Sequence, residues 1–152
     1  MPGDPERGAD SELPVVETVF GRIACAICFD ADFPSLMRDA GRARADILIV
    51  PSSDWKAIDP IHTRMALVRG VENGCAVVRQ TNLGLSAAAD AYGRILASVD
   101  YFHTRPYVMI AQVPTSGTGT LYTRWGDLFA WLCLAALLPL AGMARRRDAS
   151  VT

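Results

Sequence analysis

The chain has 152 residues, enough for about one domain with a modest hydrophobic core. Its formal net charge is −1, which excludes the strongly basic surface that nucleic-acid binding needs, so no nucleic-acid partner is expected. Hydrophobic residues make up 51% of the chain, and the excess over an ordinary soluble domain is concentrated near the C-terminus.

The first half of the chain predicts strands that alternate with helices. Residues 1–13 are rich in charge, proline and glycine and are expected to form a loop. Two short runs on either side of Gly21 predict a two-strand unit. The predicted elements, in order, are strands at 14–20 and 23–27, a helix at 34–45, a strand at 46–50, a helix at 58–73 and a strand at 75–79.

The helix at 58–73 carries two further expectations. Asp59 is the predicted N-terminal cap, because aspartate accepts hydrogen bonds from the free amides of a first turn. Ile61, Met65, Val68 and Val71 recur at helical spacing and are expected to form one apolar side.

The second half predicts a run of strands. The segments 86–90 and 95–99 flank the turn Ala91-Tyr92-Gly93-Arg94 and predict a β-hairpin, and YVMIAQV at 107–113 predicts one more strand. Strands that alternate with helices and then follow one another indicate a layered α/β sandwich.

The apolar stretch 127–143, DLFAWLCLAALLPLAGM, precedes Arg145, Arg146 and Arg147. It is apolar all round, and Trp125 and Trp131 suit a membrane interface, so the sequence predicts one C-terminal transmembrane helix. The arginines would then be cytoplasmic and the rest of the chain extracytoplasmic. A buried core helix or a helix lying in the membrane plane are the alternatives.

Four cysteines raise the possibility of a disulfide or a metal site. Cys25 and Cys28 form a single C-x-x-C pair within a strand-like run, whereas Cys75 and Cys133 stand alone. Residues an odd number of positions apart on a strand point to opposite faces, which disfavours a redox pair or a shared zinc ion. No metal is therefore expected, and Cys25 is interpreted as a small core residue.

Cys28 is the candidate nucleophile. It ends an apolar strand-like run, and the chain turns and restarts as a helix at Pro34, so the sulfur can be exposed above the sheet edge and attack a carbonyl carbon. Asp30 and Asp32 either orient this site or cap the following helix. His62 has no cysteine or aspartate at a catalytic spacing and is interpreted as structural.

Five stretches together resemble a known family. They are GRIACAICFDADFP, RADILIVPSSDW, HTRMALVRGVENG, VVRQTNLGLSAAADAYGRIL and TLYTRWGD. The chain from about Val15 to Met143 is similar to the nitrilase, or carbon–nitrogen hydrolase, superfamily. Within it, the sequence most resembles the C-terminal part of the apolipoprotein N-acyltransferases, and the N-terminal part is absent from this chain.

The resemblance implies an αββα sandwich and a Glu-Lys-Cys triad. Cys28 would be the nucleophile, and the backbone amide of Phe29 would help to bind the oxyanion. Trp55 lies in a loop that borders the family's pocket, and Glu72 matches a glutamate kept near its site. A phospholipid would donate the acyl chain and a lipoprotein would accept it, at the bacterial plasma membrane and with no cofactor.

Two triad members have no counterpart here. Lys56, the only lysine, follows the cysteine, and Glu12 and Glu17 lie too close to the nucleophile strand to match the base. The chain is therefore interpreted as the C-terminal portion of a longer enzyme, inactive without its missing N-terminal half. Its expected divisions are a loop remnant at 1–13, part of a carbon–nitrogen hydrolase domain at 14–120, a transmembrane helix with its approach at 121–144 and a basic cytoplasmic tail at 145–152.

Two other functions remain open. Asp30 stands where the acyltransferases usually have glutamate and soluble nitrilase-type amidases have aspartate, which favours a membrane-anchored, amide-hydrolysing relative. The missing Glu and Lys favour a non-catalytic remnant domain.

Overall fold

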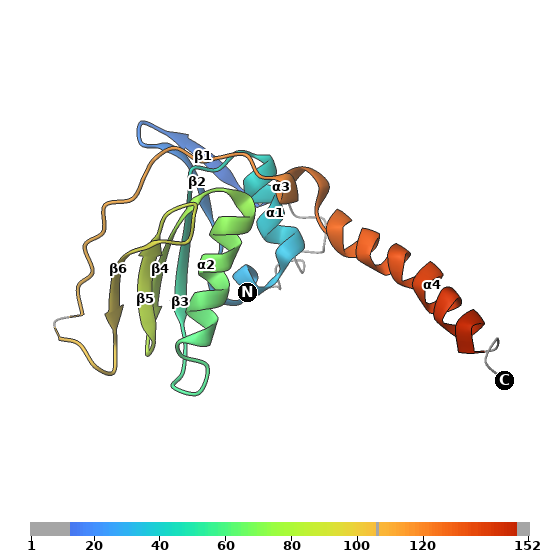
Figure 1. Ribbon diagram of the computed structural model, residues 1–152. Coiled ribbons are helices and arrows are strands. Elements are labelled where there is room, and N and C mark those ends of the chain that lie inside the picture. Colours follow the sequence, from blue (N-terminus) through green and yellow to red (C-terminus); the bar gives the residue numbers. More distant parts are fainter. Residues whose placement is uncertain (1–12, 106, 149–152) are drawn as a thin grey trace, which may run out of the picture.

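A computed structural model describes residues 13–105 and 107–148 and shows one six-stranded sheet with helices on one face (Figure 1). The strands lie in sequence order from one edge to the other. They are β1 (Val15–Thr18), β2 (Gly21–Cys25), β3 (Ile47–Ser53), β4 (Ala76–Asn82), β5 (Leu85–Ala89) and β6 (Ile95–Asp100).

The centre of the sheet is parallel and its flanks are antiparallel. β2, β3 and β4 are parallel because a helical connection returns the chain after β2 and again after β3. β1 joins β2 through a hairpin, and β5 pairs with both β4 and β6, which confirms the two predicted hairpins.

The helical connections are α1 (Pro34–Arg42), which follows the short 3-10 helix η1 (Cys28–Asp32), and α2 (Ile61–Asn73). α1 ends three residues before the predicted end, because the chain turns through Arg44 at φ 54° before it enters β3. Pro60 is the N-cap of α2, and the carboxylate of Asp59 instead accepts a hydrogen bond from the amide of Leu85 at 2.6 Å, so the predicted cap is wrong.

The hydrophobic core lies between the sheet and the two helices. Leu48 and Val50 of β3, Val77 of β4 and Met37 of α1 are all fully buried there. The opposite face of the sheet has no helical layer in the described part of the chain, and Ile49 and Cys25 are exposed on it. The interpretation of Cys25 as a core residue is therefore wrong, since it points to the uncovered face.

α2 packs on the sheet with a face of small and polar residues. Its buried residues are His62, Thr63, Ala66, Leu67, Gly70 and Asn73. The apolar side that the sequence predicts, which includes Ile61 and Val68, is turned outward and exposed. A helix that places histidine and threonine against a sheet needs polar partners there, and these partners form the site described below.

The predicted strand at 107–113 is not present. The segment runs beside the sheet without joining its ladder, and it continues across the start of the parallel strands toward α3 (Leu121–Trp125). Asp46 holds this segment in place, because its carboxylate accepts hydrogen bonds from the Gly117 amide at 2.7 Å and the Arg22 amide at 2.8 Å.

The prediction of a C-terminal transmembrane helix is wrong. The stretch forms α4 (Leu128–Asp148), which extends away from the sheet (Figure 1). Its uncharged part, from Leu128 to Ala144, spans about 25 Å, short of the ~30 Å hydrocarbon core of a bilayer. Among the residues that the structure describes, no helix combines the length and the apolar character that crossing a membrane requires.

Asp46 yields a stability prediction. The Arg22 and Gly117 amides hold the pKa of Asp46 below the usual 3.8, so its contribution is complete above that value and is lost as the pH falls through the lowered folded-state pKa. We expect Asp46→Asn to lower the free energy of unfolding by about 1–2 kcal/mol at neutral pH, measured by urea denaturation. The difference from the native chain should shrink as the pH falls below 3.8 and through the lowered folded-state pKa of Asp46.

The matched control is Asp39→Asn, which removes an exposed pair with Arg42 and should cost less than about 0.5 kcal/mol. A loss for Asp46→Asn that persists unchanged in acid would contradict the role of the ionised carboxylate.

Candidate active site

The candidate site lies where the parallel strands end. β2 and β3 run side by side, so the turn after β2 and the loop after β3 emerge at the same edge of the sheet. The carboxyl ends of strands in an open α/β sheet are the usual place for a binding site. Cys28 follows β2 and Asp54 follows β3, and α2 begins close to both.

Cys28 is the first residue of η1 and has a left-handed backbone, with φ at 50°. This conformation costs a non-glycine residue roughly 1–2 kcal/mol, and such strain often accompanies a functional role. The side chain is partly exposed, and its Sγ lies 3.7 Å from the carbonyl oxygen of Ser53 at the end of β3. The predicted strand-to-helix turn is thus present, although β2 ends at Cys25.

Asp30 closes this turn. Its Oδ2 accepts a hydrogen bond from the Ile27 amide at 2.9 Å, and its own amide donates to the Ile27 carbonyl at 2.9 Å. Of the two roles considered for Asp30, the geometry is that of a cap, here of η1. The cap holds the residues on both sides of Cys28 in place.

Phe29 lies directly after Cys28, and no acceptor bonds its amide within residues 13–105 and 107–148. That N–H is free to donate to an oxygen that develops negative charge beside the sulfur. The Phe29 ring is largely exposed, and its centroid is 5.7 Å from that of Phe33 and 6.2 Å from that of His62.

Behind the turn, a buried ion pair joins β4 to the end of β3. Arg79 is completely buried, and its Nη2 lies 3.0 Å from both carboxylate oxygens of Asp54. The Arg79 Nε donates to the hydroxyl of Thr63 at 3.0 Å, and this hydroxyl donates to the Leu85 carbonyl at 2.6 Å. A buried guanidinium needs such partners, because an unpaired buried charge is strongly destabilising.

His62 connects this ion pair to the nucleophile turn. Its ring is almost wholly buried, with Nδ1 at 2.7 Å from Asp54 Oδ1 and Nε2 at 3.3 Å from Asp32 Oδ2. The sequence analysis missed this cluster because its members are far apart in the chain. One signal was available: Arg79 lies in the otherwise apolar run CAVVR, and a charge inside a buried strand requires an ionic partner.

Two other predicted site residues lie at opposite ends of the sheet. Trp55 follows Asp54 in the loop after β3 and is 58% exposed at the Cys28 edge. Glu72 lies in the last turn of α2, which runs back toward the start of β4, and its carboxylate pairs with Arg69. The structure therefore brings Trp55 to the edge that carries Cys28 and does not bring Glu72 there.

The family model for carbon–nitrogen hydrolases matches residues 4–122, most of the chain. The chain belongs to the carbon–nitrogen hydrolase family. Curated relatives support this assignment. The chain is 33% identical over 149 residues to the apolipoprotein N-acyltransferase of Geobacter metallireducens, covering 95% of this chain and 28% of the relative. It is 35% identical over 117 residues to that of Vibrio cholerae, covering 73% and 23% respectively.

Solved structures show the same fold. An amidase from Nesterenkonia sp. aligns at a TM-score of 0.62 with 19% identity, over 76% of this chain and 44% of the amidase. Nit3 of Saccharomyces cerevisiae, a member of branch 10 of the nitrilase superfamily, aligns at 0.55 with 26% identity, over 59% and 37%. The fold is therefore a nitrilase-like mixed α/β sheet with helices, and the chain spans about a quarter of the acyltransferases it matches.

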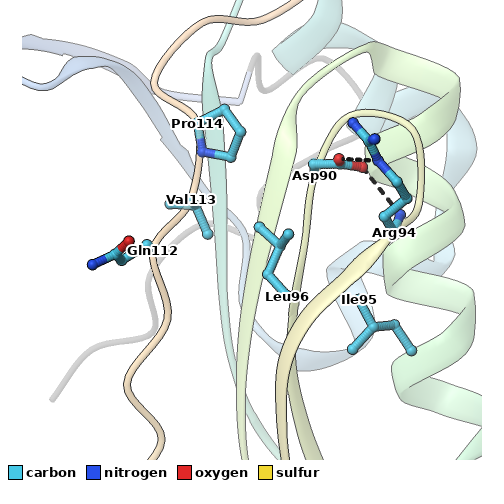
Figure 2. Close-up of a pocket in the computed structure, with 7 residues that line it drawn as sticks. All are labelled: Asp90, Arg94, Ile95, Leu96, Gln112, Val113 and Pro114. Carbon is cyan, nitrogen blue, oxygen red and sulfur yellow. Dashed lines mark hydrogen bonds and ion pairs between the residues drawn. The ribbon is translucent and has the colours of Figure 1, made fainter.

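The chain has a large cavity away from Cys28. It measures about 610 Å³ and lies between the turn after β5 and the segment 112–114 (Figure 2). The Asp90–Arg94 pair, with Oδ2 and Nε 2.7 Å apart, closes that turn at the end of the sheet where β3 and β4 begin. No cysteine, serine or histidine lines this cavity, so it lacks a nucleophile.

A smaller cavity of about 330 Å³ lies on the uncovered face of the sheet. Asn82 contributes to it, and Asn82 is in register with Ser53, whose carbonyl contacts the Cys28 sulfur. Its apolar and aromatic lining comes from Val78, Val99, Tyr101, Tyr107 and Met109. The partly apolar cavity therefore reaches the strand next to the one whose end contacts Cys28, and Cys28 itself does not line it.

The buried ion pair yields a prediction. Arg79→Met keeps most of the side-chain volume but leaves the Asp54 carboxylate buried without its cation, so we expect a loss of about 3–5 kcal/mol in the free energy of unfolding. Urea denaturation of the full chain measures this loss. Arg64→Met, at an exposed position of α2, is the control and should change stability by no more than about 0.5 kcal/mol.

The double variant Asp54→Asn/Arg79→Met tests the coupling, since it removes both charges. Its loss should be smaller than the sum of the two single losses. Strict additivity would mean that the pair does not act as a unit.

Proposed function

We propose that the chain is the nucleophile-bearing C-terminal part of a bacterial apolipoprotein N-acyltransferase. In this proposal, Cys28 takes a fatty acyl chain from a phospholipid as a thioester and passes it to the N-terminal amine of a lipoprotein. The observation that carries the proposal is Cys28 itself, held by a strained turn at the open edge of the sheet in a chain 33% identical to such an enzyme.

The chemistry has two half-reactions. The Cys28 thiolate attacks the ester carbonyl of the phospholipid, a C–S bond forms, and the glycerol oxygen leaves with a proton as a lysophospholipid. The lipoprotein amine then attacks the thioester carbonyl, a C–N bond forms, the C–S bond breaks, and the amine proton is lost as the thiolate returns. The free amide of Phe29 would stabilise the oxyanion in both steps.

Several features of the site support an acyl substrate. A thioester is a good acyl donor to an amine, so one cysteine serves both steps. The cavity lined by Val78, Tyr107 and Met109 would hold part of the acyl chain against apolar surface. Because the donor is a lipid, we place the reaction at the bacterial plasma membrane, with the domain on its extracytoplasmic side.

The chain needs two groups that it does not supply. Within the described residues, the family's base and its lysine have no counterpart in the turn that carries Cys28, where Asp30 caps η1 and Asp32 faces His62. We propose that a further polypeptide segment supplies the Glu and Lys over the uncovered face of the sheet. When catalytic residues act as a unit, the loss of one member removes most of the activity, so little activity is expected from the chain alone.

Amide hydrolysis is the second candidate. The observation that favours it is Asp30, since aspartate at this position is typical of soluble nitrilase-type amidases. Small amides would then acylate the same Cys28 and release ammonia. The two candidates differ in the acyl donor and in the group that accepts the acyl chain.

The test is acylation of the cysteine. The full chain is mixed with the N-terminal part of the Geobacter metallireducens relative that it does not match and with vesicles of phosphatidylethanolamine carrying an alkyne-tagged fatty acid. We expect a hydroxylamine-labile label on Cys28, reduced about 10³-fold or more in Cys28→Ala. Cys25→Ala, which removes an exposed thiol three residues away, is the matched control and should label normally.

Equal labelling of the Cys28→Ala variant would refute the proposal. Absence of lipid label together with Cys28-dependent release of ammonia from acetamide would select the amidase instead.

A further inference from the structure

His62 is the only residue that contacts both the buried ion pair and the nucleophile turn within the described part of the chain. Its Nδ1 lies 2.7 Å from Asp54, its Nε2 lies 3.3 Å from Asp32, and its ring lies beside that of Phe29. Asp32 and Phe29 both belong to η1, the helix that begins at Cys28. His62 therefore contacts the turn at two points.

Contacts with Asp54 and its buried partners fix the orientation of the His62 ring. Asp54 is held by two contacts from Arg79 at 3.0 Å, and Arg79 is held in turn by the Thr63 hydroxyl. His62 Nδ1 lies 2.7 Å from Asp54 Oδ1 and 2.9 Å from Arg79 Nη2, and its Nε2 faces Asp32. His62, Asp54, Arg79 and Thr63 are all buried, so solvent does not compete for their contacts.

The contact between His62 and Asp32 is looser. The Nε2 and Oδ2 atoms are 3.3 Å apart, and within the described residues Asp32 Oδ1 and His62 Nε2 are both buried without a hydrogen-bond partner. Buried polar atoms without partners are rare and need an explanation. Hydrogen bonds of catalytic sites are often long before substrate binds and tighten afterwards.

The strained backbone at Cys28 must be held by its surroundings, and the contact between His62 and Asp32 is one way to hold it. A left-handed residue other than glycine persists only where its surroundings hold it. Asp30 holds the start of η1 through the Ile27 amide, and Asp32, at its end, has His62 Nε2 at 3.3 Å from its Oδ2. Without the second contact, the turn can relax and carry the sulfur away from its position beside Ser53.

We propose that His62 is a positioning residue for Cys28. Anchored by the Asp54–Arg79 pair, His62 holds Asp32 and the ring of Phe29 in place. This inference rests on the proposed function for the identity of Cys28 as the acylated residue. The geometry of the turn itself does not depend on that function.

The test uses two isosteric substitutions that separate the contacts. Glutamine places its amide nitrogen near the position of Nε2, so His62→Gln keeps a donor toward Asp32. Asparagine places its nitrogen near Nδ1, so His62→Asn keeps only the contact with Asp54. Asp32→Ala removes the other partner, and His103→Asn is the matched control, because His103 forms an exposed pair with Asp100.

Two readouts are measured on the full chain. The first is hydrogen exchange of the Asp30 and Phe33 amides, which are bonded within the turn. We expect exchange to be about tenfold faster in His62→Asn and Asp32→Ala, and close to native in His62→Gln and His103→Asn. The second is the rate of lipid-dependent acylation of Cys28, which should fall about tenfold in the same two variants and recover in His62→Gln.

The outcomes are distinguishable. Equal exchange in His62→Asn and His62→Gln, or faster exchange with an unchanged acylation rate, would overturn the positioning role. If the native chain takes no acyl label, the proposed function fails, and the exchange and glutamine-rescue data alone decide whether His62 holds the turn.

Discussion

The buried pair of Arg79 and Asp54 is the constraint on which the rest of this edge of the sheet depends. A guanidinium with no exposed surface needs buried partners, and here Nη2 and Nε find them at the end of β3 and in the first turn of α2, whereas Nη1 has none among the described residues. The pair therefore fixes how α2 lies on the sheet. It explains why the helix buries histidine and threonine while its larger apolar residues face outward.

The same pair determines what surrounds the nucleophile. Asp54 seats His62, His62 faces Asp32, and Asp32 ends the helix that starts at Cys28. Polar partners that orient a reactive group through a second layer of contacts commonly matter nearly as much as the group itself. In this chain Arg79, Asp54 and His62 form that layer, whereas the opposite face of the sheet is uncovered within the described residues.

Local pattern was enough to predict most of the sheet and the position of Cys28. The apolar run DILIV predicted a central strand, and the turn between two alternating segments predicted the β5–β6 hairpin, because both depend on neighbouring residues. The strand predicted for YVMIAQV failed because an apolar run does not show whether a strand has a partner for its ladder. Asp59 failed as a cap because a distant amide, that of Leu85, competes for its carboxylate.

The buried residues that contact the Cys28 turn could not be predicted from their spacing in the sequence. His62, Asp54 and Arg79 meet only because β3, α2 and β4 fold together, and Glu72 is carried to the other end of α2 by the direction of that helix. The prediction of a transmembrane helix at the C-terminus failed because an apolar composition does not by itself supply the length of a spanning segment.

The left-handed backbone at Cys28 has a consequence for how this sequence can change over time. Glycine adopts that conformation without steric cost, so the backbone there would accept glycine more readily than cysteine. Folding and chemistry therefore favour different residues at one position, and selection for stability alone would remove the thiol. A cysteine retained at such a position is held by selection for what its sulfur does.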